Sequence, residues 1–490
     1  MELDDDLAAI QEVRTLVRAA KAAQARLATF SQAEIDRICA AMAQAGHDHA
    51  QELARQAVAE TGFGRVEDKV VKNLFACDRV WAAIKDVHTV GIIADDPVRG
   101  ITEVGVPLGV IAGVIPSTNP TSTAMFKAII SVKAGNAIVM TPHPGAKACT
   151  QAAARIVAEA GQAAGLPAGA VSCISHPTLD GTTALMGHPD VALTLATGGP
   201  GMVRAAYSSG NPAIGVGPGN GPAYIERTAD IPVAVRRIID SKTFDNGTIC
   251  ASEQSIVTEE CIRDQVIAEL TRQGGYFLRP GEKEAVGAIL MRADNTMNPA
   301  VVGRTAERIA EMAGVSVPAG TRVLLGFETE VGHKFPYSRE KLCPVLGFYS
   351  APDWQSACDL CIRILLHEGA GHSMTIHSRD EDVIREFACQ KPVSRLLVNT
   401  PAALGGIGAT TDLVPSLTLG CGAVGGNSTS DNIGPLNLIN IRRVARGKRE
   451  LSDLRQASPA DGRIEAPAET GVDMERLVRL VMAQLTGASV

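Results

Sequence analysis

One cysteine of this 490-residue chain stands in a different setting from most of the other ten. Cys250 falls in the loop 244–253, FDNGTICASE, ahead of a strand predicted at 254–257, whereas most of the others fall in apolar helical or strand patterns. A thiolate is a strong nucleophile when it is exposed and polarised, while a thiol packed in a core is inert. Cys250 is therefore a candidate nucleophile, although its spacing alone still favours a structural thiol.

Polar residues directly follow a strand predicted at 110–115. The segment 116–123, PSTNPTST, lies between that strand and a helix expected to begin near Met125. Loops at the carboxyl ends of parallel strands are where α/β proteins bind ligands. Asn119 is placed there to offer a fixed amide donor. The alternative is a plain turn and helix cap, because Ser, Thr, Asn and Pro are turn formers in any case.

Glycines gather in two further loops, 197–202 (TGGPGM) and 215–222 (GVGPGNGP). Glycine lets a flat ring or a phosphate approach the backbone, and a high glycine density marks close approach of a ligand or of neighbouring backbone. Neither loop fits the G-x-G-x-x-G dinucleotide motif. The segment that does, 420–425 (GCGAVG), follows no clear strand-to-helix opening, so we interpret that match as a coincidence.

Histidines and a cysteine pair raise the question of a metal site, and the sequence predicts none. His367, His372 and His377 are five residues apart, and the stretch HEGAGH is one residue longer than H-E-x-x-H. Positions i and i+5 do not face one side of a helix. Cys358 and Cys361 form a C-x-x-C pair inside a helical pattern, with no second pair to complete a zinc site, so both are expected in the core.

The elements that must position these residues follow two patterns. Residues 7 to 85 show helical apolar spacing, and Ser31 with Glu34 forms a capping box. From about residue 100, short apolar runs alternate with Ala-rich helical stretches, which is typical of βαβ units around a parallel sheet. A second α/β region follows from about 240 to 425. The predicted strands are 110–115, 137–140, 171–174, 192–196, 222–225, 254–257, 322–325, 374–377 and 396–398.

Composition narrows the function classes. Hydrophobic residues make up 46% and aromatic residues 3%, the net charge is −7, and no long basic stretch exists, so we expect no nucleic-acid partner. No apolar run reaches the roughly 18 to 20 residues that cross a bilayer, so we expect no membrane partner. The acidic start, Met1 to Asp6, is unlike a secretory signal, so a cytoplasmic enzyme is expected.

The last residues differ from the rest. Residues 456–471 are rich in Ala, Pro, Asp and Glu and are predicted to be a solvated linker. Residues 472–485 resume a helical pattern with one apolar face, and 472–490 are interpreted as an amphipathic helical tail. Such a tail can dock on its own subunit or oligomer, or it can bind another protein.

Four of these stretches together resemble the CoA-acylating branch of the aldehyde dehydrogenase superfamily. The likeness covers roughly residues 5 to 450 and implies an α/β fold. A Rossmann-type cofactor domain would occupy 1–240 with a return segment at about 426–450, an α/β catalytic domain would occupy 241–425, and a small oligomerisation element would complete the fold. The stretches are IPSTNPTSTAMFKAIISVKAGNAIVMTPHP (115–144), LATGGPGMVRAAYSSGNPAIGVGPGN (195–220), KTFDNGTICASEQS (242–255) and PSLTLGCGAVGGNS (415–428).

The resemblance implies roles for single residues. Cys250 would attack the aldehyde carbonyl, and the Asn119 amide with the Cys250 backbone N–H would hold the oxyanion. Glu340 would bind the nicotinamide ribose. His372 is a candidate for assisting the thiol, with a packing role as the alternative. The other residues expected to line the cofactor are Ser117, Thr118, Pro142, His143, Pro144, Thr197, Gly198, Gly199, Met202, Val216 and Gly217.

Two departures from the hydrolytic members bear on the acyl acceptor and the cofactor. Those members carry a water-activating glutamate at or next to the position of Val216, where this chain has no carboxylate. A thioester without such a base hydrolyses slowly, whereas a thiol can displace it directly, so we expect coenzyme A as acceptor. Hydrolytic members also carry a lysine for the adenosine ribose where Thr141 stands, so NAD and NADP both remain open.

The expected reaction is the oxidation of a short-chain aldehyde, propionaldehyde or acetaldehyde, to its acyl-CoA. Sulfoacetaldehyde or another substituted aldehyde is an alternative substrate, and a non-catalytic microcompartment lumen protein is an alternative from another class. The tail resembles the encapsulation peptides of bacterial microcompartment enzymes, which implies a shell protein as partner and a location inside such a compartment. A homodimer or homotetramer is expected.

Overall fold

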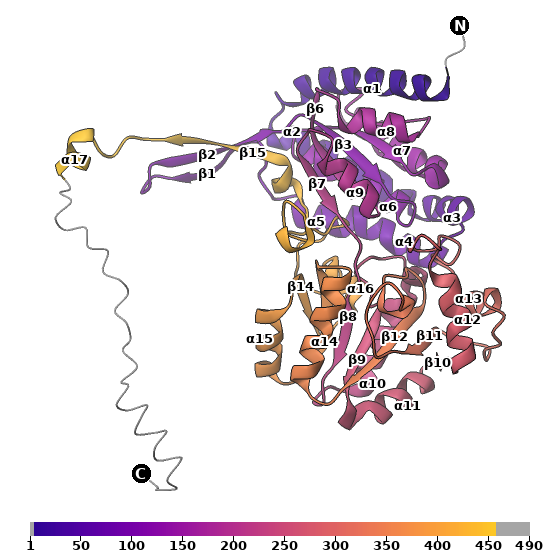
Figure 1. Cartoon of the computed structure of the whole chain (residues 1–490). Coiled ribbons are helices and arrows are strands. Elements are labelled where there is room, and N and C mark those ends of the chain that lie inside the picture. Colours follow the sequence, from indigo (N-terminus) through magenta and orange to yellow (C-terminus); the bar gives the residue numbers. More distant parts are fainter. Residues whose placement is uncertain (1–3, 457–490) are drawn as a thin grey trace. The chain divides into compact units, whose positions relative to one another are not determined.

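The computed structural model describes residues 4–456. Contacts between its residues divide the described chain into a large unit, 4–94 with 103–442, and a small unit, 95–102 with 443–456. The predicted tail (472–490), and the predicted linker (456–471) beyond Gln456, lie outside the described residues. The large unit holds two parallel sheets (Figure 1).

The first 85 residues are helical, as predicted. The capping box at the start of α2 is confirmed, since the Ser31 backbone N–H donates to Glu34 Oε2 at 2.8 Å and the Glu34 N–H donates back to Ser31 Oγ at 3.3 Å. The helices are α1 (Asp5–Leu27), α2 (Gln32–Asp48), α3 (Ala50–Thr61), α4 (Val66–Leu74), the π-helical turn η1 (Phe75–Arg79) and α5 (Val80–Ile84).

The first sheet has five parallel strands in the order β5-β4-β3-β6-β7. The chain builds outward from β3 in one direction and, after β6, in the other, so the topological switch point lies between β3 and β6. The strands are β3 (Val110–Ile115), β4 (Ala137–Pro142), β5 (Val171–Cys173), β6 (Val191–Thr197) and β7 (Ala213–Val216). The helices between them are α6 (Pro120–Lys133), α7 (Lys147–Ala163), α8 (Leu179–Met186) and α9 (Pro200–Tyr207).

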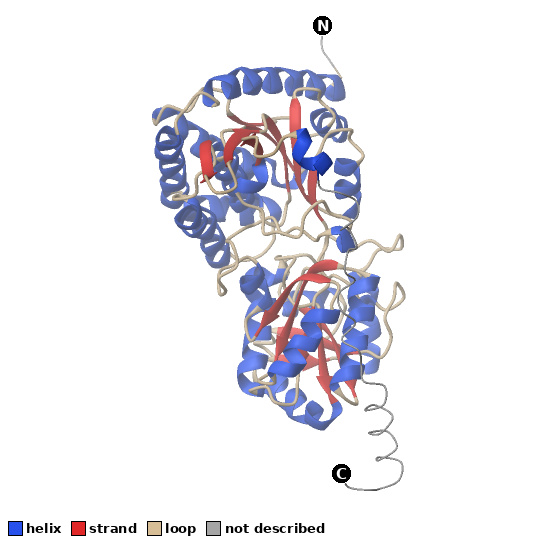
Figure 2. Cartoon of the chain, turned by 90° about the vertical axis from the view of Figure 1, so that its left-hand side faces the viewer, coloured by secondary structure: helices blue, strands red, loops and turns tan. Residues whose placement is uncertain are grey.

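The second sheet has seven parallel strands in the order β10-β11-β12-β9-β8-β13-β14, and helices flank both sheets (Figure 2). Its strands are β8 (Pro222–Ile225), β9 (Ser255–Glu259), β10 (Gly275–Phe277), β11 (Val323–Phe327), β12 (Val345–Ala351), β13 (Gly371–His377) and β14 (Val393–Val398). Its helices are α10 (Ile231–Thr243), α11 (Arg263–Arg272), α12 (Pro280–Leu290), α13 (Ala306–Met312), α14 (Trp354–His367), α15 (Glu381–Gln390) and α16 (Ala402–Gly406).

Two details of this sheet bear on the predictions. The strand β8 pairs with β9 and β13, so the chain passes from the first sheet to the second between β7 and β8, ahead of the boundary expected near residue 240. Cys358 and Cys361 are buried on α14 in the apolar cluster between that helix and the sheet, which confirms the core role predicted for them.

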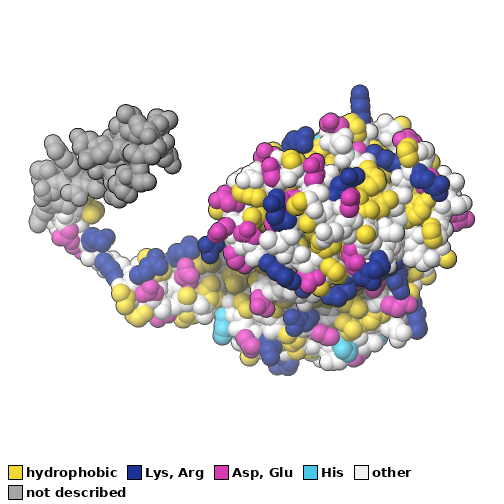
Figure 3. Space-filling view, turned by 90° about the horizontal axis from the view of Figure 1, so that it is seen from below, with side chains coloured by type: hydrophobic (Ala, Val, Ile, Leu, Met, Phe, Trp, Pro, Cys, Tyr) yellow, Lys and Arg dark blue, Asp and Glu magenta, His cyan; other side chains and the backbone are white. Residues whose placement is uncertain are grey.

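A three-stranded sheet, β1-β2-β15, is formed by β1 (Gly91–Asp96), β2 (Ile101–Pro107) and β15 (Ile439–Ala445), and the short helix α17 (Leu451–Gln456) follows. In the small unit the Arg446 backbone N–H donates to the Gly100 carbonyl at 3.0 Å. The strand β15 falls in the predicted return segment. On the face of the molecule shown in Figure 3, Lys and Arg side chains are interspersed with Asp and Glu.

Candidate active site

The residues expected to line the cofactor follow four strands of the first sheet. Ser117 and Thr118 come after β3, His143 after β4, and Thr197 and Val216 end β6 and β7. These strands pair in parallel, so their carboxyl ends meet at one edge of the sheet, on both sides of the switch point. The structure therefore brings together the segments that the sequence singled out.

The turn from β6 into α9 is open and carries an unpaired polar atom. Within the described residues the buried Thr197 Oγ1 has no hydrogen-bond partner. A Cβ added at Gly199 would meet no heavy atom within 4 Å, and one added at Gly198 would lie 3.3 Å from Met202 Cβ. An open backbone, a free hydroxyl and a helix N-terminus fit a nicotinamide dinucleotide, which presents polar groups and phosphates.

Cys250 lies just before β9, at the amino-terminal edge of the second sheet, and is partly exposed. The strand β13 starts at the same edge. His372 is its second residue, and His372 Nε2 lies 3.2 Å from Cys250 Sγ. Its Nδ1 lies 2.8 Å from Ser373 Oγ, which fixes the plane of the ring. A nucleophile within hydrogen-bond reach of an imidazole is the arrangement that cysteine chemistry requires.

The surroundings keep this pair uncharged. Burial, with Glu340 and Cys421 nearby, raises the pKa of Cys250 to about 12, although Arg395 acts against this rise. Burial and Arg395 lower the pKa of His372 to about 3. At neutral pH the proton therefore stays on the sulfur, and a further positive charge beside Cys250 would favour the thiolate.

The glycine run 215–222 passes directly against the nucleophile. A Cβ at Gly219 would lie 2.0 Å from the Cys250 carbonyl oxygen and 3.2 Å from His372 Cγ, so no other residue fits. The Gly219 N–H donates to Glu340 Oε1 at 3.0 Å. Burial and Glu368 raise the pKa of Glu340 to about 8. The expected close approach is confirmed, and the neighbour is backbone of the nucleophile loop. Val216 ends β7 and is buried.

A buried ionic cluster that the sequence does not predict contacts the nucleophile loop 244–253. Lys72 Nζ donates to Asn119 Oδ1 at 2.5 Å, to Asp245 Oδ2 at 2.5 Å and to Thr248 Oγ1 at 2.9 Å. Lys69 Nζ also donates to Asp245 Oδ2, at 2.9 Å. The signal available was the i, i+3 spacing of the two lysines on one helix, which by itself does not distinguish a buried face from a solvated one.

The two other histidines have surroundings of their own. His377 sits at the other end of β13 from His372, and His367 packs its ring edge against His333. Residues 4–456 contain no group of three or more His, Cys, Asp or Glu side chains that could hold a metal ion. The segment 420–425 is a loop that ends in the 3-10 turn η6 (Ala423–Gly425) and does not join a strand to an α-helix, which supports its interpretation as a coincidental match.

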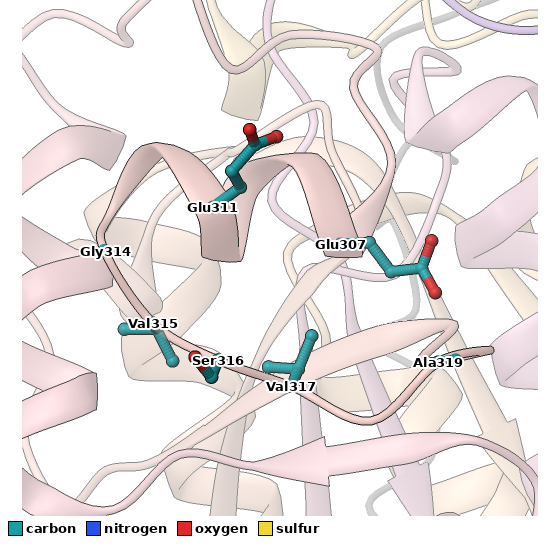
Figure 4. A pocket seen from close by; sticks show the side chains of 7 residues that line it. All are labelled: Glu307, Glu311, Gly314, Val315, Ser316, Val317 and Ala319. Atoms are coloured by element: carbon teal, nitrogen blue, oxygen red, sulfur yellow. The ribbon is translucent and has the colours of Figure 1, made fainter.

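A separate hollow of about 490 Å³ lies between α13 and the loop 314–319 (Figure 4). Its two carboxylates are already engaged, since Glu307 Oε1 accepts the Gly320 N–H at 2.7 Å and Glu311 pairs with Arg308 at 2.6 Å. None of the helices in the described part of the chain is long and apolar enough to span a bilayer.

Comparisons with known proteins agree with this geometry. A bifunctional aldehyde-alcohol dehydrogenase of Escherichia coli (strain K12) is 46% identical over 442 residues, which cover 89% of this chain and 50% of that protein. The chain thus spans about half the length of this relative and of an aldehyde-alcohol dehydrogenase of Clostridium acetobutylicum. An acetylating aldehyde dehydrogenase structure from Geobacillus thermoglucosidasius is 52% identical with a TM-score of 0.90, over 92% of this chain and 99% of that one.

A probable aldehyde dehydrogenase structure from Listeria monocytogenes EGD-e is 59% identical with a TM-score of 0.92, over 92% of this chain and 100% of that one. The predicted resemblance to acylating members is confirmed, because a relative with more than half of its residues identical is named as acetylating. The sequence pattern of the aldehyde dehydrogenase family matches residues 6–337. The chain belongs to the aldehyde dehydrogenase family.

Proposed function

We propose that this enzyme oxidises a short-chain aldehyde with NAD(P)⁺ and transfers the acyl group from Cys250 to coenzyme A. The observation that carries the proposal is the contact of Cys250 Sγ with His372 Nε2. In addition, the glycine run 215–222 has Val216 where hydrolytic members have a carboxylate. A thiol beside an imidazole supports acyl transfer. The missing base argues against water as the acceptor.

In the first half-reaction the Cys250 sulfur attacks the aldehyde carbon while its proton passes to His372. The carbonyl oxygen becomes an oxyanion that the Asn119 amide and the Cys250 backbone N–H stabilise; one such donor is worth about 10² to 10³ in rate. A nicotinamide dinucleotide, which Thr197, Gly198 and Gly199 would help to hold, would supply the hydride acceptor and a positive charge when bound. Collapse of the oxyanion expels the hydride and leaves a thioester on Cys250.

His372 first releases to solvent the proton that it took from Cys250. In the second half-reaction the CoA thiol then gives its proton to His372 and attacks the thioester. The new carbon–sulfur bond forms to CoA, and Cys250 leaves as a thiolate that recovers the proton. A propionaldehyde dehydrogenase of Rhodopseudomonas palustris, solved with bound CoA and an acylated cysteine, supports this step. It is 26% identical with a TM-score of 0.80, over 89% of this chain and 97% of that one.

For the substrate we favour propionaldehyde or acetaldehyde over sulfoacetaldehyde. A sulfoacetaldehyde dehydrogenase of an Acholeplasma species is 36% identical over 88% of this chain, so the substituted aldehyde remains the second candidate. A sulfonate needs cationic donors in the pocket. Arg395, a cation that influences Cys250, already donates through Nη1 and Nη2 to the Ser430 and Gly420 carbonyls and to Asn432 Oδ1, while its buried Nε has no partner within the described residues. The engagement of both terminal nitrogens argues for an uncharged substrate.

The test is NADH or NADPH formation from propionaldehyde, acetaldehyde and sulfoacetaldehyde, each with and without CoA. We expect CoA-dependent turnover with the two unsubstituted aldehydes and with either or both nucleotides. Equal rates without CoA would overturn the acylating assignment. Faster turnover of sulfoacetaldehyde would reverse the choice of substrate, and no reduced nucleotide from any aldehyde would favour the lumen protein.

We further propose that residues 472–490 bind a microcompartment shell protein and that the enzyme assembles as a homodimer or homotetramer. A propionaldehyde dehydrogenase from the fucose utilisation microcompartment of Clostridium phytofermentans, 29% identical with a TM-score of 0.81 over 89% of this chain and 97% of that one, supports the first part. Deleting 471–490 should leave turnover unchanged and abolish co-sedimentation with shells. Co-sedimentation that persists after the deletion would overturn the proposal of shell binding. Analytical sedimentation of the intact enzyme measures its oligomeric state.

A further inference from the structure

Asp245 is the centre of a buried charge cluster behind the nucleophile loop. Its side chain is 0% exposed, and its carboxylate accepts the ammonium groups of Lys69 and Lys72, the Thr248 hydroxyl at 2.7 Å and the Arg65 backbone N–H at 2.8 Å. Although burial would raise it, the two lysines hold the pKa of Asp245 below its ordinary value. The carboxylate is therefore ionised and fully hydrogen-bonded at neutral pH.

The backbone around Asp245 is built to hold it there. Asp245 and Asn246 have φ angles of 47° and 52°, a left-handed conformation that is uncommon outside glycine but more accessible to Asp and Asn than to most residues. The Asp245 N–H donates to Asp68 Oδ2 at 2.8 Å, and a Cβ at Gly64 would lie only 1.8 Å from Asp245 Oδ1. Such an arrangement of the chain persists only where the surroundings determine it.

Lys72 links this cluster to Asn119. Its Nζ lies 2.5 Å from Asn119 Oδ1, so the amide oxygen must face the ammonium and the NH₂ group must point the other way. That NH₂ donates to the Thr248 carbonyl at 3.3 Å, two residues before Cys250, and to Thr118 Oγ1 at 3.2 Å. An ammonium has three donors and no acceptor, so it excludes the flipped amide.

We propose that Lys72, held in place by Asp245, is a positioning residue that orients and polarises the Asn119 amide as the oxyanion donor. This inference rests on the proposed function, in which Asn119 serves that donor role. An ammonium on the amide oxygen withdraws electron density from the NH₂ group, which strengthens it as a donor in a low-dielectric site. A flipped amide would instead turn its oxygen toward the developing negative charge.

The charge count supports a role beyond folding. Two buried ammonium groups face one fully ionised carboxylate, with Asp68 as the second, half-buried acid. Burial lowers the pKa of Lys72 to about 8, against the opposing effect of Asp245. A lysine kept only to satisfy Asp245 would duplicate the contact that Lys69 already makes. The additional contacts that Lys72 makes are those to the Asn119 amide oxygen and the Thr248 hydroxyl, and only the first of these reaches the proposed oxyanion donor.

The decisive experiment is a double-mutant cycle between Lys72→Met and Asn119→Ala, read as kcat/KM for the aldehyde from NAD(P)H formation. We expect Asn119→Ala to lower kcat/KM by about 10² to 10³ and Lys72→Met to lower it by about 10- to 100-fold. Lys72→Met added to Asn119→Ala should lower it little further, because residues that act through one contact are not additive. Additive effects, or full activity of Lys72→Met, would overturn the inference.

Conservative and matched variants separate positioning from stability. Lys72→Arg keeps a cation at this position and should restore part of kcat/KM lost in Lys72→Met, and it should move the alkaline limb of the pH profile upward, because arginine stays charged. We expect this alkaline limb to follow the titration of the Lys72 ammonium, which is influenced by the charged groups of Asp245, Lys69 and Asp68. A limb that does not move in Lys72→Arg would contradict the proposal. Should Lys72→Met fail to fold, Lys72→Gln enters the same cycle.

Lys133→Met is the control. Lys133 is equally buried on α6 and pairs with Asp36 and with the Lys85 carbonyl at 2.9 Å, without contact to the nucleophile loop. It should lower Tm while its effect on kcat/KM stays additive with Asn119→Ala. Because the assay follows hydride transfer, it reports the Cys250 step whichever acceptor later removes the acyl group. A wild-type enzyme whose turnover ignores CoA would therefore refute the proposed acceptor and leave this cycle interpretable.

Discussion

The two sides of Cys250 differ in the charge of the side chains that surround it. On one side stand His372 and the backbone of Gly219, and the nearby titratable groups are shifted toward their neutral forms. On the other side stand Lys72 and Asp245, which are buried as a tightly contacting ion pair. The neutral side keeps the thiol protonated until a substrate complex changes the local charge. The ionic side has fixed charges that cannot move without breaking several hydrogen bonds.

The difference shows how one site can be both rigid and reactive. Buried charges are expensive unless they are paired and hydrogen-bonded, and the Asp245 cluster meets both conditions. A nucleophile cannot be locked in the same way, because it must change its charge during the reaction. The reactive groups are therefore placed where burial shifts their pKa values. The ion pair of Lys72 and Asp245, on the other side, holds the nucleophile loop in position.

The largest expected effect is the loss of the nucleophile itself. Cys250→Ala should abolish NAD(P)H formation and leave the fold intact, because the site needs the sulfur only for chemistry. The measurement is turnover together with the circular dichroism spectrum and Tm. Residual turnover above about 1% of wild type would contradict the assigned nucleophile.

The contact between Gly219 and the nucleophile loop gives the next test. Gly219→Ala places a methyl group 2.0 Å from the Cys250 carbonyl oxygen, so the loop or β8 must shift. A displacement on the order of 1 Å at a reacting group lowers the rate about 10²-fold. Gly199→Ala, where a Cβ meets nothing within 4 Å, is the matched control in the same enzyme and should fold normally. Unchanged kcat/KM in Gly219→Ala would show that the backbone there is not needed.

The neutral side also predicts how His372→Ala behaves. His372 Nε2 is the group within 3.2 Å of the sulfur that can hold its proton, so its loss should lower turnover by about 10²-fold, the usual size of one acid–base catalyst. The deficit should shrink as pH rises, because hydroxide then removes the proton from a thiol whose pKa is about 12. Turnover that is unchanged at every pH would leave His372 a packing residue.

The strand ends are the part of this molecule that its sequence predicts well. The runs predicted at 110–115 and 222–225 are β3 and β8, because strands buried on both faces read as continuous apolar segments. The strands β7 and β12 were not predicted, since Gly215 and Gly347 interrupt their apolar runs. The polar loops that follow the strands lie where parallel topology requires.

The ionic side could not be predicted in the same way. The stretch 66–73, VEDKVVKN, has the mixed charges of a solvated helix, and nothing local indicates that Lys69 and Lys72 are buried. Their partner Asp245 is 173 residues from Lys72 along the chain. A pairing of this kind depends on tertiary packing, whereas Asn119, next to its strand, depends on local order. The residue roles taken from the family remain predictions.

The third buried carboxylate, that of Glu253, gives a further test of the comparison, and its expected effect is the smallest. Glu253 lies three residues after Cys250, and it accepts the Ala402 N–H at 2.9 Å while its Oε2 has no partner within the described residues. Burial raises its pKa to about 7, although Ser241 and the Ala402 N–H act against this rise. It resembles Asp245 in burial and lacks the adjacent ammonium pair.

The sign of its pH effect follows from that difference. Because the folded-state pKa is above the ordinary value of 4.5, the stabilising contribution of Glu253 is present below pH 4.5 and is lost as the pH rises through 7. Glu253→Gln stays neutral, so it should be more stable than wild type by on the order of 1–3 kcal/mol at pH 8 and equal to it near pH 4. Urea titrations at both pH values measure the free energy of unfolding. Asp245→Asn is the opposite case, because we expect it to lower the stability at pH 8. A Glu253→Gln variant that loses stability at pH 8 would mean that this carboxylate is ionised and paired, and the contrast between the two kinds of buried acid would fail.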